Sequence, residues 1–143
     1  MKRRPCWYLR KTIFTVRFLI VSVKAMSRSK FIALAAMTLD GRIARKAGEF
    51  TNWTSAEDKA QLHRELDSAD AIVVGRTTYT TAREALSKRR CIIFTRSTIV
   101  CKEENDLVTY LNPAVVGVEQ FCKEKNYSRV AVLGGTETYT YFF

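Results

Sequence analysis

Residues 70–79 read DAIVVGRTTY and carry a complete strand, turn and helix signal. The residues from Ala71 to Val74 are all apolar and mostly β-branched, which is typical of a strand buried on both faces of a parallel sheet. Gly75 and Arg76 end that run, and the threonines after them can cap a short helix to about Leu86. The stretch therefore predicts a strand, a tight turn and a helix in direct succession.

The same alternation continues through the chain from residue 30 onward. Apolar runs predict further strands at residues 30–38, 90–95, 107–110 and 129–133. Helical signals separate them, at residues 55–69, 112–125 and 136–143. Strands that alternate with helices imply βαβ crossovers, so the expected fold class is α/β, with a mostly parallel central sheet flanked by helices.

The helix ends carry capping signals of unequal strength. Thr54 and Glu57 have the spacing of a capping box, and Asn112 with Pro113 is typical of a helix start. The last helix runs to Phe143 with no polar finish. Both edge strands of a parallel sheet must be protected from pairing with other chains, and the sequence does not show how the second edge is closed. We therefore expect a truncated domain whose C-terminal strands are missing.

The charge of the chain is concentrated at its amino terminus. With 143 residues and 47% hydrophobic residues, the chain suffices for one globular domain. Residues 1–30 contain nine of the 24 basic residues and no acidic residue, so the remainder holds 15 basic residues against 14 acidic ones. A surface for nucleic acid over the whole body is therefore not expected.

Residues 1–25 predict a basic extension outside the fold. Their apolar run at residues 13–23 is interrupted by Arg17 and is too short for a membrane span of roughly 20 residues. A signal or transit segment is one interpretation, and a functional start at Met26 is the other. The expected domain covers residues 26–143, in the cytoplasm, with no membrane or nucleic-acid partner. Binding of either partner through the basic extension is the remaining alternative.

Metal and disulfide chemistry have little support in the sequence. The cysteines, Cys6, Cys91, Cys101 and Cys122, form no CxxC or ligand spacing, so they are expected to be reduced thiols. His63 is the single histidine, which leaves metal sites and histidine-based nucleophiles without their usual partner.

Three predicted strands end in motifs suited to anions. In parallel α/β sheets, ligands bind at the carboxyl ends of the strands, where glycine turns and helix starts offer backbone N–H groups. A glycine turn after a strand is by itself more often a simple tight turn, but the placement of the three motifs on one edge points to a phosphorylated nucleotide. The two arginines favour a highly charged one such as NADPH. The motifs are Gly75-Arg76-Thr77, Thr95-Arg96-Ser97 and Gly134-Gly135-Thr136.

These motifs carry a family resemblance that covers nearly everything from residue 30 onward. The chain resembles the dihydrofolate-reductase-like superfamily, and most closely the C-terminal reductase domain of the riboflavin-biosynthesis deaminase-reductase, the RibD C-terminal type. The segments that carry the resemblance are FIALAAMTLDGRIA (31–44), WTSAEDKAQLHRELDSADAIVVGRTTY (53–79), TRS (95–97) and VLGGTETY (132–139).

The resemblance implies NADPH as the cofactor. Thr95, Arg96 and Ser97 would lie near the adenosine 2′-phosphate, and Ala36 and Ile43 would flank the nicotinamide. The glycine motifs would hold the rest of the cofactor, with the pyrophosphate at the second of them, through Gly75, Arg76, Thr77, Gly134, Gly135 and Thr136.

The resemblance also implies a reductase activity and a substrate side. Hydride would pass from NADPH to a pyrimidine of riboflavin biosynthesis, of the 5-amino-6-(5-phosphoribosylamino)uracil type, with a homodimer as a possible assembly. Asp40 and Asp58 are the catalytic candidates, and Asp40, Gly41, Trp53 and Asp58 line the substrate. Two departures keep alternatives open: Asp58 also suits an early-helix acid, and Leu133 stands where riboflavin reductases carry an acid. Pterin reduction and an inactive truncated fragment are those alternatives.

Overall fold

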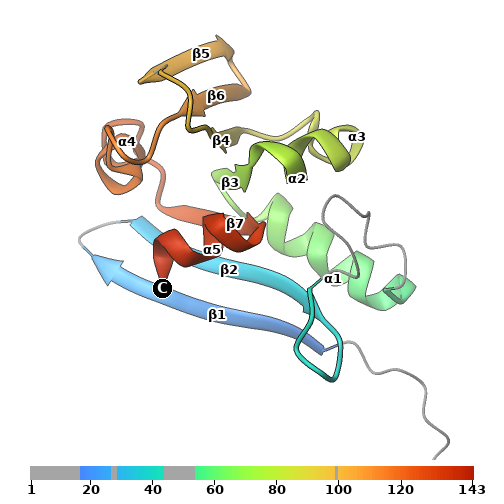
Figure 1. Ribbon diagram of the computed structural model, residues 1–143. Helices are drawn as coiled ribbons and strands as arrows, with labels where there is room; N and C mark the ends of the chain where they lie inside the picture. Colours follow the sequence, from blue (N-terminus) through green and yellow to red (C-terminus); the bar gives the residue numbers. More distant parts are fainter. Residues whose placement is uncertain (1–16, 27–28, 44–53, 99) are drawn as a thin grey trace, which may run out of the picture.

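The computed structural model describes residues 17–26, 29–43, 54–98 and 100–143, and within them the chain forms one sheet with helices on both faces (Figure 1). The strands are β1 (Arg17–Met26), β2 (Ser29–Met37), β3 (Ala71–Gly75), β4 (Cys91–Phe94), β5 (Cys101–Asn105), β6 (Val108–Leu111) and β7 (Arg129–Gly134). The helices are α1 (Ala56–Asp67), α2 (Arg76–Thr81), α3 (Arg83–Leu86), α4 (Val118–Glu124) and α5 (Thr136–Phe142).

The sheet has seven strands in the order β1-β2-β7-β3-β4-β6-β5. The strands β2, β7, β3, β4 and β6 are parallel, and the outer strands β1 and β5 each pair antiparallel with their neighbour. The predicted α/β class with a mostly parallel sheet is therefore confirmed. Parallel order brings the carboxyl ends of five strands to one edge, which is where the three anion-friendly motifs belong.

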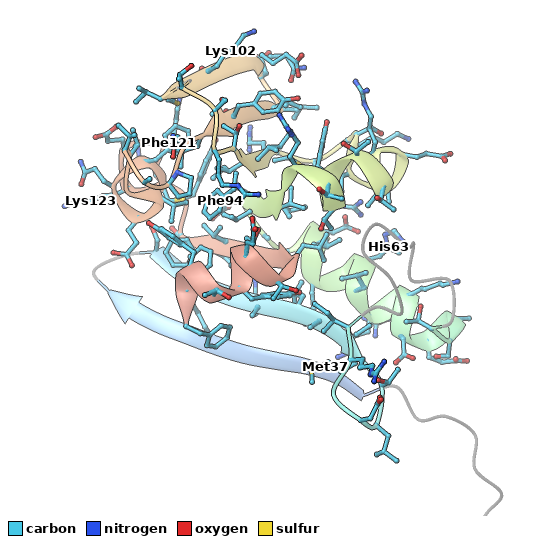
Figure 2. The ribbon with its side chains drawn as sticks, viewed as in Figure 1. Met37, His63, Phe94, Lys102, Phe121 and Lys123 are labelled. Carbon is cyan, nitrogen blue, oxygen red and sulfur yellow. The ribbon has the colours of Figure 1, made fainter. Side chains whose placement is uncertain are left out.

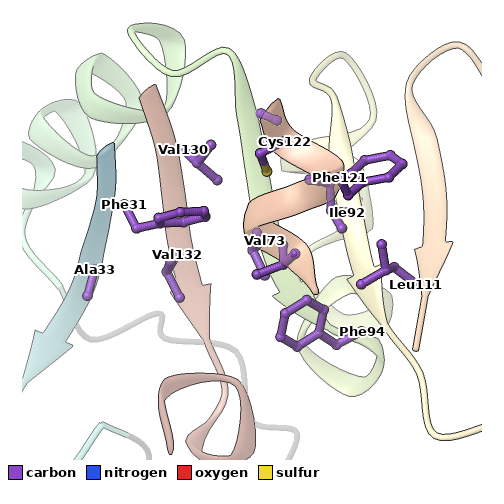
Figure 3. Close-up of a cluster of buried hydrophobic side chains, with 12 residues drawn as sticks. Phe31, Ala33, Val73, Ile92, Phe94, Leu111, Phe121, Cys122, Val130 and Val132 are labelled. Carbon is purple, nitrogen blue, oxygen red and sulfur yellow. The ribbon is translucent and has the colours of Figure 1, made fainter. Parts of the chain in front are cut away.

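Each face of the sheet has its own core, because successive side chains of a strand point to opposite faces. Phe31 and Val73 face α4 and α5, whereas Ile32 and Val74 face α1, α2 and α3. Figure 3 shows the first of these cores, with Phe121 and Cys122 of α4 over the sheet. Burial on both faces explains why β3 reads as a continuous apolar run rather than an alternating one.

The start of α1 differs from the sequence prediction by one residue. Ser55, not Thr54, is the N-cap: its hydroxyl accepts a hydrogen bond from the Asp58 amide at 3.1 Å, and the Asp58 carboxylate accepts from the Ser55 amide at 3.3 Å. The predicted capping box of Thr54 with Glu57 is therefore wrong, since the neighbouring pair has the same spacing and takes the role.

The helix predicted from residue 112 begins later, at Val118. Asn112 does act as a cap, but of a separate turn: its side-chain oxygen accepts from the Ala114 amide at 3.0 Å, and its carbonyl accepts from the amides of Val115 and Val116. Gly117 then provides the N-cap of α4. The segment after β3 also divides into α2 and α3 at Ala82.

The first strand departs furthest from the sequence prediction. β1 pairs with β2 from Arg17↔Met37 to Met26↔Ser29, so residues 17–25 are part of the sheet. The expectation that the whole of residues 1–25 lies outside the fold is therefore wrong for residues 17–25. Arg17 interrupts the apolar run and so argues against a membrane span, but a charged residue is common in an edge strand.

Candidate functional site

The two glycine turns that follow β3 and β7 touch each other at the carboxyl edge of the sheet. A Cβ atom at Gly75 would lie 3.0 Å from Thr138 Oγ1 and 3.5 Å from the Gly135 nitrogen. A Cβ atom at Gly135 would lie 3.4 Å from Thr78 Oγ1. The backbone of each turn therefore approaches the other closely, as the adjacency of β3 and β7 requires. The structure brings two of the three predicted motifs together.

Gly134 adopts a conformation that favours glycine, and it lies against Tyr139. Its φ is +97°, and the peptide to Gly135 is cis. A Cβ atom at Gly134 would lie 2.7 Å from the Tyr139 ring. The Tyr139 hydroxyl donates a 2.7 Å hydrogen bond to the Leu34 carbonyl, and burial raises the pKa of Tyr139. This contact ties α5 to β2 and β7, and so holds the second glycine turn in position.

The starts of α2 and α5 leave backbone donors available. Their N-cap residues, Gly75 and Gly135, have no side chain that could accept from the first-turn amides. Thr77 and Thr136 are exposed in those first turns, and Arg76 is exposed without an ion-pair partner within the described ranges. Amide, hydroxyl and guanidinium groups therefore lie at one edge, and all three donate hydrogen bonds that phosphate oxygens can accept.

The third motif follows β4 and reaches the same edge. Thr95 is buried, and its hydroxyl donates to Ser97 Oγ at 3.1 Å and accepts from the Ser97 amide at 3.2 Å. Arg96 is exposed, and its Nη1 atom lies 3.3 Å from Oε1 of Glu137 on α5. Because β3 lies between β4 and β7, this pair spans the end of β3. Figure 2 labels Met37, the last residue of β2, and Phe94, the last residue of β4.

Glu137 is a site residue that the sequence reasoning missed. An acidic residue in the first turn of a helix reads as a dipole-favouring surface residue, and nothing in the sequence pairs it with Arg96. The pairing depends on a crossover between strands that are not sequence neighbours. Its only sequence signal is its place two residues after Gly135.

Asp40 lies in a tight turn after β2. The Thr38 hydroxyl donates to its carboxylate, and Arg42 Nε lies 3.1 Å from Asp40 Oδ2. The hydrogen bond from Thr38 lowers the pKa of Asp40, and Arg42 acts in the same direction. Gly41 has a φ of +80°, which the turn requires. Asp40 is therefore a carboxylate at neutral pH, suited to orienting a donor rather than to supplying a proton.

The other substrate-side candidates are placed less favourably or lie outside the described residues. One oxygen of the Asp58 carboxylate, Oδ2, accepts from both the amide and the hydroxyl of Ser55, at 3.3 and 3.0 Å, and so takes part in capping α1. Ala36 and Ile43, the predicted nicotinamide neighbours, are partly buried, at the end of β2 and in the loop after it. Trp53 lies outside the described residues.

Two surface hollows lie at the opposite edge of the sheet. One lies near the starts of β3 and β4 and is lined by Asp67, Glu84, Ala85, Ser87, Lys88 and Arg89. The other lies near the starts of β2 and β7 and is lined by Ser29, Lys123 and residues 126–128. No group of metal-ligating side chains occurs in the part of the chain that the structure describes. In that same part, every helix is too short or too polar to cross a membrane.

Comparison with known families tests the resemblance directly. The RibD C-terminal domain family matches residues 29–142, from the first residue of β2 to the last residue of α5. A search of the curated proteins found no match. The family match supports a reductase-type function in riboflavin biosynthesis. Since the match covers most of the sequence, this chain belongs to the RibD C-terminal domain family.

Proposed function

We propose that this chain binds NADPH and transfers hydride to a pyrimidine intermediate of riboflavin biosynthesis, of the 5-amino-6-(5-phosphoribosylamino)uracil type. The observation that carries the proposal is the close contact between the Gly75 and Gly135 turns, with Arg96 reaching the same edge. A family match to a reductase domain supports the same conclusion.

The residues at this edge fit a dinucleotide with an additional phosphate. The glycine turns let the first-turn amides of α2 and α5 approach the pyrophosphate, while Arg96 and Ser97 are suited to the 2′-phosphate. Arg76 lies at the start of α2 with its guanidinium exposed. When bound, the nicotinamide supplies the hydride, and the chain contributes position and charge.

On the substrate side, the proposal assigns Asp40 an orienting role. As a carboxylate held by Thr38 and Arg42, it can accept hydrogen bonds from ring or amino N–H groups. The capping box uses Oδ2 of Asp58, which weakens the case for pterin reduction, because a pterin would need that carboxylate to accept from its own ring. A pyrimidine is therefore the preferred substrate class.

Titration with NADPH and NADH tests the cofactor. We expect Arg96→Ala and Arg76→Ala each to weaken the binding of NADPH by about tenfold or more, because each removes a charge-assisted contact with phosphate. The loss for NADH should be much smaller for Arg96→Ala, since NADH lacks the 2′-phosphate. Arg64→Ala, in the last turn of α1 at the opposite edge, is the matched control and should leave both affinities unchanged.

Turnover by the full chain tests the substrate class. We expect NADPH oxidation with the ribosylaminopyrimidine and not with dihydrofolate. Absence of NADPH binding, or equal losses for NADPH and NADH in Arg96→Ala, would remove the cofactor assignment. Turnover of dihydrofolate alone would replace the pyrimidine with a pterin.

A further inference from the structure

The ion pair between Arg96 and Glu137 joins the guanidinium assigned to phosphate with a carboxylate of this same chain. Arg96 Nη1 and Glu137 Oε1 are 3.3 Å apart. Both side chains are largely open to solvent, with relative exposures of 85% and 75%. An exposed pair is held weakly, so a competing anion can replace the carboxylate.

The position of Glu137 places its charge at the nucleotide edge. It lies in the first turn of α5, two residues after Gly135, and it faces Arg96 across the end of β3. No other acidic side chain within the described ranges forms an ion pair with Arg96. Arg96 therefore has one internal anionic partner there, and that partner directly follows the predicted Gly134-Gly135-Thr136 motif.

We propose that Glu137 is a specificity-determining residue that lowers the preference of this site for a 2′-phosphorylated cofactor. The inference rests on the proposed function, because it takes Arg96 as the phosphate ligand. The contact uses Nη1 of the guanidinium, so a phosphate that takes a pair of donors including Nη1 competes with the carboxylate for it. The displaced carboxylate then remains close to a phosphate of the same charge, which opposes binding further.

Neutralising Glu137 should therefore strengthen binding only of a ligand that carries the 2′-phosphate. We expect Glu137→Gln to raise the affinity for the 2′-phosphorylated ligand by about fivefold. This corresponds to about 1 kcal/mol, the upper value for an exposed ion pair. A nucleotide without the 2′-phosphate does not compete with Glu137 for Arg96. The affinity of the chain for such a nucleotide should therefore change by less than about twofold.

Calorimetric binding of adenosine 2′,5′-bisphosphate and of ADP by the full chain tests this inference without relying on activity. The variants are Glu137→Gln, Arg96→Ala and the double variant. Glu119→Gln is the matched control: Glu119 is also the second residue of a seven-residue helix with a glycine N-cap, and it forms no ion pair in the described part of the chain. It therefore reproduces the loss of charge and of helix-dipole stabilisation.

The expected result is tighter binding of the bisphosphate by Glu137→Gln only, with the gain abolished in the double variant. An unchanged or weaker affinity in Glu137→Gln, an equal gain for ADP, or a gain that persists without Arg96 would each overturn the inference while leaving the cofactor assignment intact. A wild-type chain that binds neither nucleotide would overturn the proposed function itself, and this inference with it.

Discussion

At the scale of single residues, Gly134 carries more structural constraint than its neighbours. Its φ of +97° lies in the left-handed region, and the Tyr139 ring occupies the space a side chain would need. That ring is held by the hydrogen bond from its hydroxyl to Leu34 on β2. The turn that carries the candidate site is therefore specified by one glycine and one tyrosine acting together.

Gly134→Ala should destabilise the fold markedly. A non-glycine residue at this φ costs about 1–2 kcal/mol, and overpacking against the ring adds about 1–3 kcal/mol. Urea unfolding, monitored by circular dichroism, measures the loss. Gly117→Ala is the control, because that glycine has an ordinary φ and a Cβ atom there would meet no other atom within 4 Å, so a change within about 0.5 kcal/mol is expected. Equal losses in the two variants would contradict the account.

The described cysteines behave as their burial requires. Cys91, Cys101 and Cys122 are free; Cys91 and Cys122 are buried, whereas Cys101 is exposed. Burial raises the pKa of Cys91 to about 11 and that of Cys122 to about 12, so both are protonated at neutral pH. They contribute to the two cores as small apolar side chains rather than as nucleophiles.

At the scale of elements, the capping box decides how α1 begins. Ser55 and Asp58 satisfy each other's backbone amides, and Glu57 and Asp58 place negative charge in the first turn. This explains why an acidic residue with the spacing expected of a substrate ligand is engaged in a structural role.

Ser55→Ala should lower the free energy of unfolding by about 1 kcal/mol, because the Asp58 amide loses its acceptor. Chemical denaturation checks the value. Ser87→Ala is the comparison, since that hydroxyl donates only to the Glu84 carbonyl at an exposed helix end, and we expect a loss below about 0.5 kcal/mol. Should Ser55→Ala be as mild as Ser87→Ala, the box would not stabilise α1.

At the scale of the whole molecule, two separate cores meet on one sheet, and the outermost strand beside β2 comes from the basic segment. β1 pairs with β2 along nearly all of β2, whose residues 31–34 are buried. Without β1, the backbone groups on that side of β2 would lose their partners and form an exposed edge.

A chain that starts at Ser27 should therefore be less stable than the full chain, by on the order of 1 kcal/mol per lost hydrogen bond, and should self-associate. Denaturant unfolding and light scattering measure both effects. A chain that starts at Arg17 separates the contribution of β1 from that of residues 1–16. Unchanged stability in the Ser27 chain would return residues 17–25 to the status of an extension outside the fold.

Local patterns in the sequence were sufficient for the elements whose own residues decide their structure. The apolar runs of β2, β3, β4 and β7 appear at or within a residue or two of the predicted positions, because burial on both faces requires continuous apolar residues. β5 was missed for the complementary reason: its residues are all exposed, so it has no hydrophobic pattern, and pairing with β6 alone makes it a strand.

The sequence by itself therefore determined the α/β class, the positions of the buried strands along the chain and the three motifs that follow them. Only the tertiary structure decided which of those motifs touch, that Asp58 caps a helix, that β1 joins the sheet and that Glu137 faces Arg96. The physical reason is range: apolar periodicity and turn residues act over a few neighbours, whereas these contacts join residues brought together by crossovers and by strand pairing.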